Sequence, residues 1–256
     1  LPILLLSCAK TMSAVSKVKV PLTTSPRFQK EAAEIALQMS QFSVDELERL
    51  LRVNAKIAVE NYKRYQAFHA EATPELPALL AYTGIVFKRL NPKDFSAEDF
   101  GYAQEHLRLT SFCYGLLRPL DVIRAYRLEG DVVLPELGNQ TLFFYWRSRL
   151  TDTFIEDIRS AGGILCNLAS DEMKSLFDWK RVESEVRVVT PEFHVWKNGK
   201  LATIVVYTKM SRGEMTRFIL KNKIGNPEEL KGFSWEGFEF DESLSDERKL
   251  VFINGM

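Results

Sequence analysis

The segment Ile3–Thr11 has the sequence ILLLSCAKT, in which a short apolar run is followed at once by polar and basic residues. The same change occurs where Ile164–Leu168 leads into residues 169–172, and where Leu201–Tyr207 leads into residues 208–214. Each apolar run is typical of a buried β-strand that ends in a loop or at the start of a helix. Because open α/β sheets bind their ligands at such strand ends, we expect these segments to bind a polar, anionic ligand.

The composition is that of an ordinary soluble protein, with 256 residues of which 46% are hydrophobic and 27% charged. We find no internal repeat, low-complexity tract or flexible linker, and therefore predict a single domain over residues 1–256. The 34 basic and 34 acidic side chains give a formal net charge of zero, which makes long-range attraction to nucleic acid weak. Anion binding must therefore depend on local clusters of basic residues.

Cysteine and histidine are too sparse and scattered to predict a disulfide framework, a metal site or another cofactor site. The three cysteines, at positions 8, 113 and 166, suit a reducing cytoplasm. The apolar start, Leu1–Cys8, is too short for a secretion signal and lacks its leading positive charge, so we interpret it as a buried first strand. No apolar run approaches the length of a membrane span, and we expect no membrane contact.

Hydrophobic periodicity predicts helices separated by short strands. The predicted helices are Phe28–Met39, one that begins at Thr73-Pro74-Glu75, a long one from a cap at Ser96 to about Leu117, Phe143–Ile158, and Arg212–Lys223 after a Ser211/Glu214 capping box. Glu185–Trp196 and Lys200–Tyr207 alternate apolar and polar residues around Asn198-Gly199, a strong signal for a β-hairpin. We therefore predict an α+β protein with a mixed sheet, including this antiparallel hairpin, surrounded by helices.

A pair of short helices is predicted between Ser43 and Phe68. Ser43-Val44-Asp45-Glu46 has the pattern of a capping box, and a break near residues 52–54 separates the first helix from the second. Two short helices joined by a tight bend are typical of helix–turn–helix and helix–hairpin–helix elements, but also of ordinary packed helices. Both interpretations remain open at this point.

Residues 209–223 carry five basic side chains and a single acid, Glu214. Arg217 and Lys221 are four residues apart and therefore share a helix face. The predicted helix start would offer free N–H groups to a phosphate, and Gly213 would let the phosphate approach the backbone. The alternative is a basic helix face that only contacts solvent.

A second basic cluster contains Arg108, Arg118, Arg124 and Arg127, which flank the Tyr114-Gly115 step. Arginine binds phosphate oxygens in a bidentate manner, and Tyr114 and Tyr126 could stack on bases. Alternatively, Arg118 pairs with Asp121 and Arg127 pairs with Glu129, so that both arginines only brace a turn.

Polar residues at the first two strand ends also permit catalysis. Ser7 and Lys10 have a spacing that could form a nucleophile–base pair, although we favour Lys10 as a phosphate contact. Asp171 or Glu172 could act as a general acid/base while Asn167 and Ser170 orient a sugar. The alternative is that Ser170 or Asp171 caps the following helix.

Six stretches resemble the YaaA family of bacterial peroxide-stress proteins, in order and over nearly the whole chain. They are residues 7–11, 106–108, 114–121, 126–129, 167–172 and 212–218. Cys8 stands where that family usually has proline. The resemblance implies a cytoplasmic protein that limits oxidative DNA damage, is linked to lower unincorporated iron, and has a DNA-binding fold with a helix–hairpin–helix-type element and a positive cleft.

We therefore interpret the chain as a DNA-binding stress protein, and expect a monomer that binds double-stranded or structured DNA without reading its sequence. The predicted phosphate contacts are Lys10, Arg108, Arg118, Arg127, Lys209, Arg212 and Arg217. Any effect on free iron would be indirect. The alternative hypothesis is an enzyme that acts on a nucleotide or nucleoside with glycosidase-like chemistry, using Asn167, Ser170, Asp171 and Glu172.

Overall fold

The first strand, β1 (Ile3–Leu6), lies in the middle of the main sheet of a computed structural model that describes residues 2–255. It pairs in parallel with β10 (Ile164–Asn167) on one side and with β5 (Leu107–Ser111) on the other. All four β1 side chains are at most 1% exposed. A continuous apolar run is expected of a parallel strand that is covered on both faces, so Ile3–Leu6 is the buried first strand that the sequence predicts.

The sheet is mixed, as predicted, with the strand order β13-β14-β11-β10-β1-β5-β6. Parallel pairing continues from β10 to β11 (Arg187–Lys197) and β14 (Lys249–Asn254), and β13 (Phe238–Phe240) and β6 (Gly115–Leu117) add antiparallel edges. The predicted hairpin is confirmed, because β11 pairs in antiparallel fashion with β12 (Lys200–Ala202). At its turn Asn198 and Gly199 have φ angles of 52° and 73°, as a type I′ turn requires.

The direction of strand addition reverses at β1. The chain runs from β1 to β5 on one side, and later reaches β10 on the opposite side of β1. Such a reversal leaves a crevice at the carboxyl ends of the central strands, where connecting segments diverge. The residues that follow β1 and β10 lie at this crevice.

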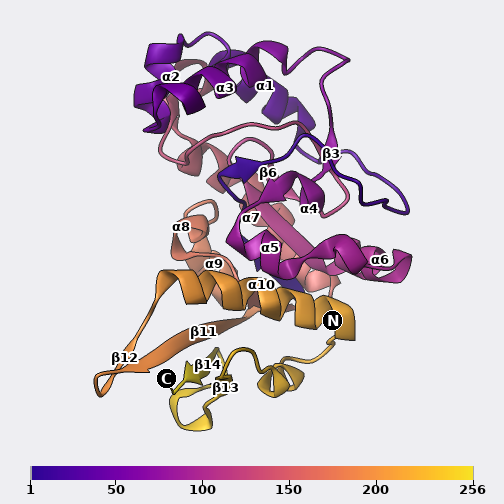
Figure 1. The fold of residues 1–256 in the computed structure, drawn as a ribbon, viewed down its shortest axis with the longest axis vertical. Helices are drawn as coiled ribbons and strands as arrows, with labels where there is room; N and C mark the ends of the chain where they lie inside the picture. The colour runs from indigo at the N-terminus through magenta and orange to yellow at the C-terminus, as the bar shows by residue number, and fades with distance from the viewer. Residues whose placement is uncertain (1, 256) are drawn as a thin grey trace.

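The helices pack around the sheet and beyond one end of it (Figure 1). Helices α1 (Gln29–Met39), α2 (Val44–Leu51) and α3 (Ala55–Ala67) form one end of the molecule, and the β11–β14 strands form the other. The remaining helices are α4 (Ala78–Ala81), α5 (Ile85–Leu90), α6 (Ala97–His106), α7 (Leu142–Ser160), α8 (Asp171–Lys174), α9 (Trp179–Glu185) and α10 (Val205–Asn222). Short 3₁₀ turns cover Pro92–Asp94, Pro135–Leu137, Pro227–Gly232 and Glu242–Leu244.

Three two-stranded sheets connect the loops. They pair β2 (Thr11–Met12) with β4 (Tyr82–Thr83), β3 (Leu76–Pro77) with β7 (Val122–Ile123), and β8 (Val133–Leu134) with β9 (Gln140–Thr141). The β2–β4 pair places the segment after β1 directly beside the segment before α5. Among residues 2–255, no helix combines the length and apolarity needed to cross a membrane.

The predicted helix pair near the N-terminus is present. Ser43 caps α2 through a complete capping box with Glu46, and the Asn54 side chain accepts a hydrogen bond from Ile57 N–H at the start of α3. Between them Arg52 adopts a left-handed φ of 52°, which turns the chain sharply. The two helices pack against each other, and the more specific helix–hairpin–helix assignment stays a prediction.

Three sequence predictions of secondary structure are wrong. The helix that begins at Ser96 ends at His106 rather than near Leu117, because Leu107–Ser111 becomes β5 and pairs with β1. The helix predicted to begin at Thr73 begins only at Ala78, because Leu76–Pro77 forms the short strand β3. Pro74 and Pro77 explain this difference, because the residue before a proline is driven into an extended conformation.

The third error concerns the segment after the hairpin. Strand β12 ends at Ala202, and α10 already begins at Val205, so the predicted strand does not extend to Tyr207. Ser211 and Glu214 therefore lie inside α10 and form no capping box, and Ser211 is fully buried. The buried residues Ser211, Met215 and Ile219 recur every four positions, which is the period of one helix face.

At Gly213, α10 packs closely against α5. A Cβ atom at Gly213 would lie 2.3 Å from the carbonyl oxygen of Val86 and 2.7 Å from Cβ of Arg89. The absence of a side chain at Gly213 therefore makes room for α5. The sequence suggested instead that it makes room for a ligand. This contact fixes residues 209–212 of α10 beside the start of α5.

We predict that Gly213→Ala destabilises the protein, because the obstructing atom of Val86 is backbone and cannot rotate away. Overpacking of this kind costs about 1–3 kcal/mol, and each kcal/mol lowers the melting temperature of a protein of this size by about 2–4 °C. Calorimetry measures the change. Gly101→Ala is the matched control, because an added Cβ in the middle of α6 meets no atom within 4 Å. Equal melting temperatures for the two variants would contradict the assigned role of Gly213.

Candidate functional site

A cavity of about 370 Å³ lies at the crevice beyond the carboxyl ends of β1 and β10. It is lined mainly by residues 6–11 after β1, 83–87 at the start of α5, residues 126–128, four residues after β10 (Leu168, Ser170, Glu172 and Met173), and Lys209 and Arg212 of α10. Two of the three strand-end segments singled out in the sequence therefore meet here as predicted. The third also reaches the cavity, but from within a helix and not from a strand end.

Direct hydrogen bonds join the ends of β1, β10 and β5. The N–H of Leu168 donates to the carbonyl of Leu5 at 2.9 Å, and the N–H of Ser170 donates to Ser7 Oγ at the same distance. The N–H of Cys8 donates to Thr110 Oγ1 of β5 at 3.2 Å. These bonds hold the loop after β1 against both neighbouring strands, so the cavity floor is a continuation of the sheet.

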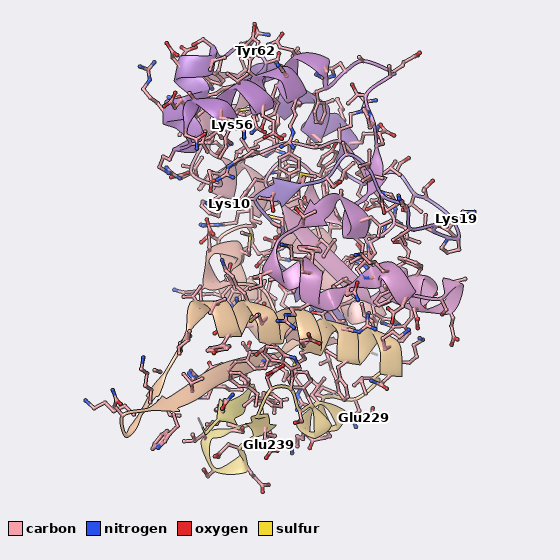
Figure 2. All side chains as sticks on the ribbon, in the orientation of Figure 1. Lys10, Lys19, Lys56, Tyr62, Glu229 and Glu239 are labelled. Atoms are coloured by element: carbon pink, nitrogen blue, oxygen red, sulfur yellow. The ribbon has the colours of Figure 1, made fainter. Side chains whose placement is uncertain are left out.

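Four of the seven predicted phosphate contacts line this cavity: Lys10, Arg127, Lys209 and Arg212. We call them, with the cavity, the cationic pocket. Lys10 and Lys209 are exposed, whereas Arg127 and Arg212 are partly buried. Figure 2 shows Lys10 between the α1–α3 end of the molecule and α10.

Glu129 organises one side of the cationic pocket. Its carboxylate accepts a hydrogen bond from Lys10 Nζ at 2.8 Å and lies 3.8 Å from Nη2 of Arg127. Because Glu129 is only 3% exposed, its pairing with Lys10 and Arg127 offsets the cost of burying its charge. The predicted turn-bracing pair between Arg127 and Glu129 is therefore present, although Arg127 also lines the cavity.

Arg212 has no comparable carboxylate partner. Among residues 2–255, its Nε is buried and has no hydrogen-bond partner. Burial lowers the pKa of Arg212, whereas the charge of Asp171 acts in the opposite direction. Arg127 shares the feature, since its Nε is also buried without an acceptor in the described part of the chain.

The remaining three predicted contacts do not line the cationic pocket. Arg108 is paired with Asp157 at 2.6 Å, Arg118 with Asp121 at 2.8 Å, and Arg217 with Asp94. Asp157 and Asp121 are themselves largely or fully buried, so Arg108 and Arg118 compensate carboxylates within the fold. The structure thus brings together four of the seven cations and places the other three in ion pairs elsewhere.

The four candidate catalytic residues are also divided. Ser170 and Glu172 line the cavity, and Ser170 Oγ lies 3.3 Å from Ser7 Oγ. Asp171 is exposed and paired with Lys174 at 2.7 Å. Asn167 is buried, and its side-chain oxygen accepts a hydrogen bond from the N–H of Ala169 at 3.2 Å. Asp171 and Asn167 therefore do not line the cavity, and Asn167 braces the turn after β10.

The two tyrosines proposed to stack on bases are buried in the protein. Tyr114 OH accepts a hydrogen bond from the N–H of Arg124 at 3.0 Å. Tyr126 OH lies 2.6 Å from both Tyr82 OH and Ser111 Oγ. Tyr126 nonetheless belongs to an apolar wall of the cavity that sequence reasoning missed, because most of its other members lie in segments without a binding motif. Those members include Ile85, Val86, Phe87, Phe112, Leu168 and Met173.

The fold and the cavity together define the general class of this protein. The protein is a mixed α/β protein whose central parallel strands end at a small cavity that has one cationic and one apolar side. A family model described as "Peroxide stress protein YaaA" matches residues 3–244. The chain therefore belongs to the YaaA family of peroxide stress proteins, in agreement with the sequence resemblance.

Relatives cover the chain over almost its full length. A protein of Bacteroides thetaiotaomicron, named UPF0246 protein, is 98% identical and the match covers 99% of each chain. Proteins of the same name from Phocaeicola vulgatus and Saccharophagus degradans are 64% and 33% identical, and the matches cover 96–98% of each chain.

We predict that the three cysteines react slowly with a thiol reagent at neutral pH. Burial raises the pKa of the Cys8 thiol, which lines the cavity, to about 12, and it also raises the pKa of Cys113 and Cys166. The nucleophilic thiolate is therefore scarce, and labelling should accelerate as the pH rises. Absorbance after addition of a disulfide reagent measures the reaction, with denatured protein as the control that releases all three thiols. Rapid labelling of one thiol in the native protein, lost in Cys8→Ser, would contradict the expectation.

Proposed function

We propose that this peroxide stress protein protects DNA by binding it through the cationic pocket. The observation that carries the proposal is the meeting of Lys10, Arg127, Lys209 and Arg212, which come from three distant parts of the chain, at one cavity. Against these four cations stand Glu172, which lines the cavity, and Glu129, which pairs with Lys10 and Arg127, so the local charge is positive although the whole chain is neutral. Contacts to backbone phosphates give affinity without sequence information, so binding is largely sequence-independent.

The size of the cavity supports a preference for structured DNA. About 370 Å³ is at the lower end of the range for small-ligand pockets, so it suits one nucleotide and not a duplex. A duplex can therefore contact only the exposed lysines at the rim. Junctions, bubbles and damaged sites offer unpaired nucleotides that can enter. In this proposal the protein acts in the cytoplasm as a monomer, and any fall in unincorporated iron is indirect.

We predict that binding to junction and bubble DNA is tighter than binding to plain duplex, and that all three weaken steeply with salt. Each phosphate contact contributes about −0.9 to the slope of log affinity against log salt for duplex DNA. Lys10→Ala and Lys209→Ala should each reduce the steepness of the duplex slope by about one. Fluorescence anisotropy at several salt concentrations measures both quantities.

Lys19→Ala is the matched control for these variants. Lys19 is an exposed lysine that lies at the right edge of the view, whereas Lys10 lies left of the centre (Figure 2). Its removal should leave affinity and salt slope unchanged. A salt-independent affinity, or equal losses for Lys19→Ala and Lys209→Ala, would exclude the cationic pocket as the DNA-binding site.

A second candidate function, an enzyme acting on a nucleotide or nucleoside with glycosidase-like chemistry, is favoured by one observation. Ser7, Ser170 and Glu172, from two different strand ends, line the same cavity as the cations. In this reading Glu172 is the general acid/base, Ser170 orients the sugar, and Lys209 or Arg212 binds phosphate. Asn167 and Asp171 are omitted because neither lines the cavity.

The enzyme hypothesis predicts turnover that depends on Glu172. Purified protein incubated with nucleotides and nucleosides should release a free base, detected by mass spectrometry. Glu172→Gln should reduce the rate by about 10²–10⁴-fold, the range expected for loss of general acid/base catalysis. Glu183→Gln, in α9 and outside the cavity lining, is the control. Turnover that survives Glu172→Gln would exclude this role.

A further inference from the structure

Arg212 is chemically unusual for a partly buried arginine. Arg108, which is buried more completely than Arg212, is paired with Asp157 at 2.6 Å and also donates to three backbone carbonyls. Within residues 2–255, by contrast, no carboxylate lies within ion-pair distance of Arg212, and its Nε has no acceptor. Burying an N–H donor without an acceptor is costly, and the described acids of the protein do not pair with this arginine.

Arg212 is held at this position by the packing of α10. The next residue, Gly213, packs against the backbone of Val86, and Val86 itself lines the cavity. The backbone of Arg212 is therefore fixed beside the cavity wall. The nearest acid in sequence, Glu214, is 3.6 Å from Arg89 and does not neutralise Arg212.

Arg127 supplies a second incompletely paired guanidinium. Its distance of 3.8 Å from Glu129 is longer than the 2.8 Å between Lys10 and the same carboxylate, and its Nε is also without an acceptor in the described residues. Two buried Nε donors from distant segments therefore line one cavity. Because both Nε atoms are themselves buried, an anion in the cavity reaches these arginines through their terminal Nη groups. A phosphate monoester suits two such groups better than a carboxylate because it offers three terminal oxygens.

The rest of the cavity fits the remainder of a nucleotide. Phe87, Phe112 and Tyr126 belong to an apolar wall that suits the faces of a base, while Ser7 and Ser170 offer hydroxyl groups to a sugar. The volume of about 370 Å³ limits the ligand to about one such unit.

We propose that the cavity is a mononucleotide site, in which Arg212 and Arg127 bind the phosphate and the apolar wall contacts the base. The same chemistry can come from a free nucleoside monophosphate or from an unpaired nucleotide of DNA, and only the second source depends on the proposed DNA-binding function. Free mononucleotide and structured DNA then compete for the same site.

The test is isothermal titration calorimetry of the full chain with deoxyadenosine 5′-monophosphate, deoxyadenosine and inorganic phosphate. The nucleotide should bind at least tenfold more tightly than the nucleoside. Arg212→Met, which keeps an unbranched apolar stem but removes the guanidinium donors, should weaken nucleotide binding at least tenfold and change nucleoside binding less than twofold. Arg212→Lys, which keeps the charge, should recover only part of the loss, and Lys19→Ala should have no effect.

Several results would overturn the mononucleotide site. One is an equal affinity for nucleotide and nucleoside, and another is the absence of binding by all three probes. The others are an unchanged nucleotide affinity in folded Arg212→Met, and a loss of nucleotide affinity in Lys19→Ala as large as that in Arg212→Met. If Arg212→Met does not fold, as judged by circular dichroism, Arg212→Lys decides the question.

A competition experiment between mononucleotide and junction DNA separates the two proposals. Nucleotide binding without binding of junction DNA excludes only DNA binding, whereas junction binding that excess nucleotide does not displace overturns the shared site.

Discussion

The structure depends on the pairing of β1 with two parallel neighbours. Ile3–Leu6 has no polar side chain, and its backbone groups bond to β10 on one side and β5 on the other. Because both edges and both faces of this strand are covered, its register fixes the positions of two segments that lie more than 100 residues further along the chain. The polar residues after β1 and β10 meet because the strands before them are paired, and the hydrogen bond from Ser170 N–H to Ser7 Oγ continues this pairing beyond the sheet.

The contact between α5 and α10 closes the other side of the cavity. It depends on the absence of a side chain at Gly213, which lets the two helices approach to backbone contact distance. Since Ile85–Phe87 and Arg212 lie on either side of this contact, the apolar wall and the less compensated of the two arginines in the cationic pocket are positioned together. A site assembled this way combines rigid helix positions with donors that the protein itself leaves unpaired.

Local patterns were sufficient to predict several parts of this arrangement. The apolar run Ile3–Leu6, the Asn198-Gly199 turn and the capping box at Ser43 each carry a signal within a few residues, and each is confirmed. The strand Leu107–Ser111 was missed because its conformation depends on pairing with β1 and not on its own sequence. Local signals similarly failed at Val205, where two β-branched residues begin a helix that is stabilised by packing on α5.

Charge pairing was the least predictable feature of the candidate site. Arg118 and Asp121 are three residues apart, and their pair could be anticipated as one alternative. The partners of Arg108 and Arg217 are 49 and 123 residues away, and no local pattern indicates them. Basic residues that are neighbours in sequence can therefore have different partners in the structure. Arg212 lines the cavity, whereas Arg217, five residues further along α10, forms an ion pair with Asp94.

The central position of β1 also has a consequence for biosynthesis. Translation delivers Ile3–Leu6 long before Leu107–Ser111, and longer still before Ile164–Asn167. During that interval the most apolar strand of the growing polypeptide has no native neighbour, which exposes it to aggregation or to capture by chaperones. Contacts so distant along the chain also favour slow folding, because the intervening loop must be closed before β1 gains any partner. The central strand of the folded protein is thus synthesised well before either of the strands with which it pairs.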